Sequence, residues 1–140
     1  MTTLRVWARV GDTMAVRPTF APGDTLTSNN MNILANSLIT VNAQTGTAYT
    51  PGTAQVGQLT TLNNAAAQTI TIPANVTTAF AIGDQLNFML LGTGTATFAA
   101  GGTAVIRSAG TKLKLTTQYA VCTVLKWDTD AWVMVGNVTA

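Results

Sequence analysis

The chain has 140 residues, the usual size of one domain, and is long enough to bury a core without disulfides. Charged residues make up only 9% of it, against about 25% in an average globular protein, and it contains no His and no Glu. The net charge of +2 is too small to indicate a nucleic-acid partner or an anionic membrane. With so few acid and base groups, we expect no enzyme, no cofactor and no metal site.

A single cysteine, Cys122, excludes an internal disulfide framework. The start of the chain lacks the basic and apolar regions of a signal peptide. No stretch approaches the roughly 20 apolar residues that span a bilayer. We therefore expect a soluble chain that is not exported.

Residues 1–42 differ from the rest and are expected to form an N-terminal extension. Within LRVWARV, Leu4 and Val6 lie on one side of a predicted strand, with Trp7 and Arg9 on the other. This strand is either the first strand of the domain or an arm that adds to a sheet edge of a neighbour. In the second case these four residues contact the neighbour.

The rest of the extension is broken by prolines and glycine in RPTFAPGD. In the following SNNMNILANSLITV, Met31, Leu34 and Leu38 have helical spacing, whereas the Asn-rich composition opposes a helix. A short helix and an irregular segment therefore both remain open.

Residues 43–140 are expected to form one all-β domain, because short strands alternate with turns rich in Gly, Pro, Asn and Asp. About eight strands are predicted, at 46–50, 55–62, 68–72, 85–91, 95–99, 104–107, 113–127 and 131–135. Their spacing favours a β-sandwich or barrel, and a jelly-roll type β-sandwich is the expected architecture. Alternation assigns the faces of strands but leaves their connectivity open.

In most of these strands one face is apolar and the other is polar. The run 119–127 is an exception, because Tyr119, Val121, Leu125 and Trp127 lie on one side while the other side is also apolar. We therefore expect the side chains on both sides of that strand to be buried against other parts of the protein or against a partner. One side can pack in the sandwich core, and a neighbouring subunit can bury edge strands.

Two short motifs invite a functional interpretation. Asp128 and Asp130 in WDTDAW are too few for a Ca²⁺ site and suit a tight hairpin turn. Arg107, Lys112 and Lys114 form the densest basic stretch. They either contact an acidic surface of a partner or lie on a solvated strand face.

The order of several motifs resembles a β-rich module of structural proteins in tailed bacteriophages. These motifs are LNNAAAQTITIPAN, AFAIGDQLNF, GTGTATFAAGGTAVIRSAG and TDAWVMVGN. The resemblance covers about two thirds of the chain and does not extend to the first 42 residues. It implies a virion protein, either a capsid cement or decoration protein or a tail, neck or adsorption component.

Length favours the first of these roles, since a tail fibre normally carries long repeats or coiled coils. We expect a cement protein on the outside of the phage shell that clamps neighbouring capsomers. The expected partners are the major capsid protein and further copies of this chain, with a dimer favoured over a trimer. No direct contact with nucleic acid or membrane is expected.

Overall fold

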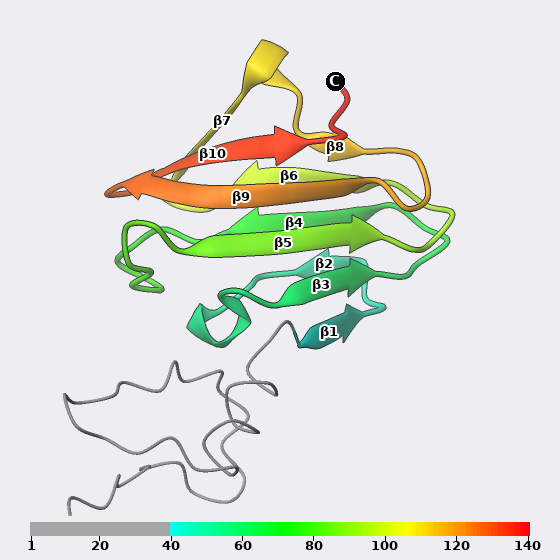
Figure 1. Cartoon of the computed structure of the whole chain (residues 1–140), viewed down its shortest axis with the longest axis horizontal. Coiled ribbons are helices and arrows are strands. Elements are labelled where there is room, and N and C mark those ends of the chain that lie inside the picture. Colours follow the sequence, from blue (N-terminus) through cyan, green and yellow to red (C-terminus); the bar gives the residue numbers. More distant parts are fainter. Residues whose placement is uncertain (1–39) are drawn as a thin grey trace, which may run out of the picture. The chain divides into compact units, whose positions relative to one another are not determined.

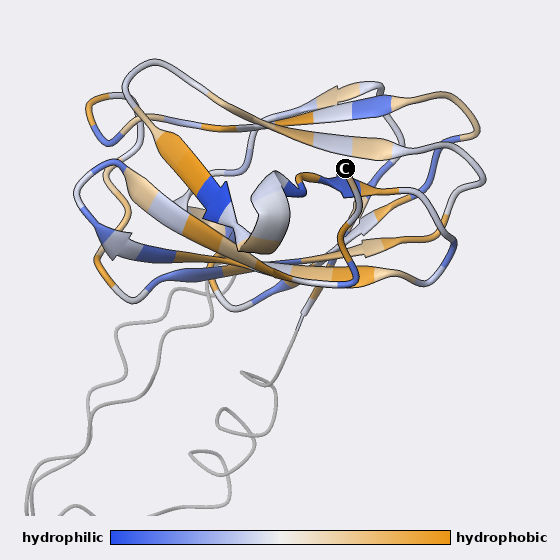
Figure 2. Cartoon of the chain, turned by 90° about the horizontal axis from the view of Figure 1, so that it is seen from above, coloured by the Kyte–Doolittle hydropathy of each residue, from blue (hydrophilic) through white to orange (hydrophobic). Residues whose placement is uncertain are grey.

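The computed structural model describes residues 40–140, which form ten β-strands and two short 3-10 helices (Figure 1). The strands build two sheets that face each other, seen as two layers in Figure 2. The predicted all-β sandwich is therefore confirmed. The predictions for Leu4, Val6, Trp7 and Arg9, and for the segment up to residue 39, lie outside the described residues.

The strands divide unequally between the two sheets. The six-stranded sheet contains, in spatial order, β1 (Val41–Gln44), β3 (Leu59–Leu62), β5 (Gln85–Leu90), β9 (Val121–Asp128), β10 (Ala131–Gly136) and β7 (Val105–Ser108). The four-stranded sheet contains β2 (Ala48–Tyr49), β4 (Gln68–Ile72), β6 (Ala96–Ala100) and β8 (Lys114–Leu115). Helix η1 (Thr53–Gln55) precedes β3, and η2 (Ala109–Thr111) joins β7 to β8.

The connectivity corrects the expectation of a jelly roll, whose strands pair antiparallel. From β1 to β8 the chain changes sheet after every strand, so β1, β3 and β5 pair in parallel, as do β2, β4 and β6. Antiparallel pairing occurs where β8 joins β6, where β9 joins β5 and where β10 folds back on β9. The physical reason is that each turn after a strand crosses to the opposite sheet instead of forming a hairpin within one sheet.

This path stacks three two-stranded coils, which we call coil 1 (β1 and β2), coil 2 (β3 and β4) and coil 3 (β5 and β6). Neighbouring coils are joined by hydrogen bonds to backbone carbonyls at the turns between their strands. The Nδ2 of Asn64 in coil 2 donates to the Thr45 carbonyl in coil 1 over 2.6 Å, and Gly94 N donates to Asn64 O over 3.0 Å. Gly92 and Gly94 are buried at this turn, where close approach of the coils requires residues without a side chain.

The core lies between the sheets, where the inward side chains of both are buried. Its largest members are Trp132, Phe88, Phe98, Leu62, Ile70, Ile72, Leu86, Leu90, Leu115 and Met134. Phe88 and Phe98 join the two sheets through an edge-to-face contact with 5.0 Å between ring centroids. Trp132 makes a similar contact with Phe80 at 5.2 Å.

Two details of the predicted strands differ from the structure. β1 was not predicted as a strand, and it spans the predicted boundary between residues 42 and 43. The predicted run 113–127 divides into β8 and β9, because the chain turns at 116–120 and Tyr119 adopts a positive φ of 65°. Neither helix in residues 40–140 has the length and apolar character to cross a bilayer.

Candidate functional site

The outward side of the six-stranded sheet is the most unusual surface of the described domain. Strand registers align its side chains in rows across β3, β5, β9, β10 and β7. We call this surface the apolar face; its outward positions are Val41, Ala43, Leu59, Thr61, Gln85, Asn87, Met89, Val105, Arg107, Val121, Thr123, Leu125, Trp127, Val133 and Val135. Arg107, on the edge strand β7, is the one charged residue among them.

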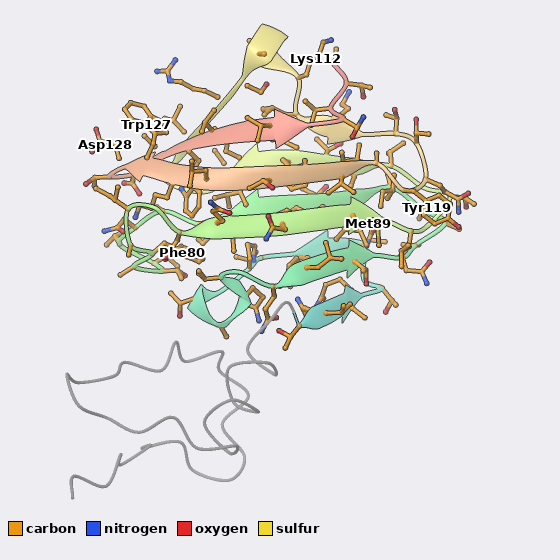
Figure 3. The ribbon with its side chains drawn as sticks, viewed as in Figure 1. Phe80, Met89, Lys112, Tyr119, Trp127 and Asp128 are labelled. Atoms are coloured by element: carbon orange, nitrogen blue, oxygen red, sulfur yellow. The ribbon has the colours of Figure 1, made fainter. Side chains whose placement is uncertain are left out.

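Several large side chains of the apolar face reach solvent. Val135 is 55% exposed and Trp127 is 52% exposed, and Val105 and Val121 are also exposed. Met89 and Trp127 come from different strands of the sheet (Figure 3). Isolated exposed apolar residues are common, but a sheet face on which ten of fifteen outward positions are apolar indicates an interaction surface.

Two polar residues near the middle of the apolar face, Asn87 and Thr123, have hydrogen-bond partners within the protein. Thr123 Oγ1 donates to Asn87 Oδ1 over 2.8 Å, and Asn87 Nδ2 donates to the Gln58 carbonyl over 3.3 Å. Because these groups already have partners, covering them with a neutral surface leaves few hydrogen bonds to be replaced. The face is therefore suited to contact with an uncharged surface.

The predicted basic residues lie along one chain segment but not on one surface. Arg107 is on the apolar face, while Lys114 on β8 points outward from the four-stranded sheet, opposite Thr97. Lys112 follows η2, on the connection between the two sheets (Figure 3). The three cations thus follow the edge where the chain passes from β7 to β8.

A buried lysine, which the sequence analysis did not single out, fixes the loop of residues 73–84. Lys126 is 2% exposed, and its Nζ donates to the Phe80 carbonyl over 2.7 Å and to Asn75 Oδ1 over 2.5 Å. Nζ also lies 5.9 Å from the centroid of Trp132. The sequence could have indicated that Lys126 is buried, because it continues the alternating series of inward residues Cys122 and Val124 on β9.

The loop fixed by Lys126 presents apolar side chains to solvent. Val76 is 90% exposed and Ile82 is 64% exposed. The backbone N of Gly83 donates to the Lys126 carbonyl over 2.8 Å, which joins the end of this loop to β9 one residue before Trp127. Two lysine hydrogen bonds and this backbone bond therefore hold an apolar loop against the β9–β10 end of the sandwich.

The turn predicted at Asp128 and Asp130 is confirmed, since it connects the antiparallel strands β9 and β10. The Asp130 carboxylate accepts hydrogen bonds from Thr103 Oγ1 and from the backbone N of Asn75, each over 2.5 Å. These bonds, with that of Thr103 first, hold the pKa of Asp130 below its ordinary value. Asp130 therefore ties the hairpin to two other loops.

We predict that Asp130 contributes to the loss of stability in acid. A lowered folded-state pKa stabilises the fold above the unfolded value of about 3.9, and this contribution disappears as the pH falls through the folded value. Chemical denaturation measured from about pH 6 to pH 2 should therefore give a shallower acid decline for Asp130→Asn and for Thr103→Ala than for the parent protein. Parallel curves for all three proteins would contradict this role.

Groups that could perform chemistry are sparse in residues 40–140. Cys122 lies in the core, and burial raises the pKa of its thiol to about 12, so the thiol is protonated at neutral pH. Within the same residues, no three His, Cys, Asp or Glu side chains gather where they could hold a metal ion.

Comparison of the chain with protein-family models, with curated proteins and with solved structures finds no match. The resemblance to a module of tailed-bacteriophage proteins therefore stays a prediction based on the sequence motifs. The apolar face and the loop at 73–84 are the two features of the described residues on which a function can be argued.

Proposed function

We propose that this chain is a structural virion protein of a tailed bacteriophage, a capsid cement protein that binds the outside of the shell and clamps neighbouring capsomers. The observation that carries the proposal is the apolar face, because a sheet surface of this extent with a single charged residue suits a protein that acts within an assembly. The motif order described above supports the assignment to a virion. In this proposal the chain is a binding module and not an enzyme.

Cementing follows from differential binding. A protein that binds the expanded shell more tightly than the immature or disrupted shell stabilises the expanded state by mass action. An attachment formed by uncharged surfaces also depends little on salt, because screening acts on charges. A low number of charges and an all-β scaffold therefore suit a protein that stabilises a capsid shell.

Expanded shells that lack this protein provide the test. We expect the purified full chain to bind them at a fixed number of copies per shell, to raise their melting temperature, and to bind unexpanded shells less well. Shells of an unrelated phage serve as the control. No binding to the expanded shells of the phage that encodes the chain, at concentrations well above those in an infected cell, would contradict the proposal.

A tail, neck or adsorption component is the second candidate. The exposed Val76 and Ile82 in the loop fixed by Lys126 favour it, since preformed apolar loops at one end of a sandwich commonly contact ligands. Binding of the purified chain to host cells or to their surface glycans, without binding to shells, would favour this second function.

A further inference from the structure

We propose that the apolar face is the interface with a second copy of this chain, in an isologous dimer formed by packing the two six-stranded sheets face to face. This deepens the proposed function, because a dimer supplies the two attachment points that a clamp requires. The dimer itself can be tested without shells.

The first argument is area. Neighbouring strands lie about 4.8 Å apart, so the five strands from β3 to β7 are roughly 25 Å across, and the eight residues of β9 extend about 27 Å. The other four strands are shorter than β9, so the 28 residues of the five strands, at about 16 Å² each, cover roughly 450 Å² in each copy. Burying this area in both copies removes about 900 Å², which is at the low end for protein interfaces and fits a weak dimer.

The second argument is charge. A face that packs on its own copy brings a charge close to its duplicate when the residue lies near the two-fold axis, so charges near that axis oppose self-association. Here only Arg107 is charged, and it lies two strands away from β9 at the sheet edge. With a two-fold axis along β9, the two copies of Arg107 lie about 20 Å apart, beyond the screening length of about 8 Å.

The third argument is the contrast between the two outer surfaces of the sandwich. The four-stranded sheet presents Thr69, Thr71 and Thr97 with Lys114, side chains that are compatible with water. The apolar face instead presents Val121, Val135 and Trp127. Sheets that pack face to face bury rows of such branched and aromatic side chains at about −30° between strand directions.

The test is sedimentation of the full chain and of two matched variants. Val135→Lys places a charge on the apolar face, and Thr69→Lys places the same charge at an exposed strand position of the other sheet. We expect the parent chain and Thr69→Lys to be dimers at tens of micromolar. Val135→Lys should weaken dimerisation by about 100-fold or more, because the interface would bury an unpaired charge. Circular dichroism and melting temperature establish that both variants fold.

Each outcome decides between the two proposals. A monomeric parent chain at about 500 μM, or a Val135→Lys dimer as tight as the parent, would overturn the dimer. A monomer that loses shell binding through Val135→Lys would overturn the dimer as well and would identify the apolar face as the shell contact. A dimer sensitive to Val135→Lys but unable to bind shells would support this inference and contradict the cement function.

Discussion

Gly92→Ala is expected to destabilise the fold by about 3 kcal/mol or more, because the added methyl group would meet backbone of the neighbouring coil. A Cβ at Gly92 would lie 2.1 Å from Asn64 O and 2.4 Å from Asn64 N. Neither connecting segment can move away freely, since Gly92 N donates to the Leu62 carbonyl over 3.0 Å and Asn64 Nδ2 donates to the Thr45 carbonyl of coil 1. Urea denaturation of the purified variant measures the loss.

Gly46→Ala is the matched control. Gly46 lies in the corresponding turn of coil 1, where the nearest atom to an added Cβ, the Ala48 carbonyl oxygen, is 3.5 Å away in ordinary contact. This variant should be close to neutral, within about 1 kcal/mol of the parent protein. If the two variants lost equal stability, close stacking of the coils at Gly92 would not be the cause. If Gly92→Ala did not accumulate as folded protein while Gly46→Ala did, the conclusion would be unchanged.

Lys126→Met is expected to lower the free energy of unfolding by about 3 kcal/mol, as it removes two charge-assisted hydrogen bonds without removing much volume. The Phe80 carbonyl and Asn75 Oδ1 would lose their donor at a site where Lys126 is 2% exposed. Breaking the contact of Nζ with the Trp132 ring adds to this loss. Thermal and urea unfolding of the purified proteins measure the change.

The exposed Lys114 provides the control for this experiment, since Lys114→Met should change stability by no more than about 0.5 kcal/mol. Limited proteolysis gives a second readout. Cleavage within residues 73–84 should accelerate in Lys126→Met and not in Lys114→Met, because Lys126 fixes that loop. Equal stability of the two variants with unchanged cleavage would exclude the role assigned to Lys126.

Alternation predicted which side chains face the core, as Leu86, Phe88 and Leu90 on β5 illustrate. It could not predict which strands pair, because alternation is the same whether the chain turns back within a sheet or crosses to the other one. The parallel coils were missed for this reason. Deciding between the two paths depends on the turns, where Gly92 approaches backbone that is distant in sequence.

The candidate site was predictable in part. Apolar residues on both sides of the run 119–127 indicated a second covered surface, and Val121, Leu125 and Trp127 do lie on the apolar face. The partners of Lys126 were not predictable, since Asn75 and Phe80 precede it by 51 and 46 residues. Long-range hydrogen bonds of this kind leave no periodic signal in a sequence.

The stacked coils also determine how the chain can fold. Among the strands of residues 40–140, only β9 and β10 pair with a strand next to them in the chain, and every other pairing there must first close a longer loop. Such a topology folds slowly, in milliseconds to seconds, and the hairpin that forms most readily follows all three coils in the chain. During synthesis the strands of the coils therefore emerge before the simplest nucleus of this domain.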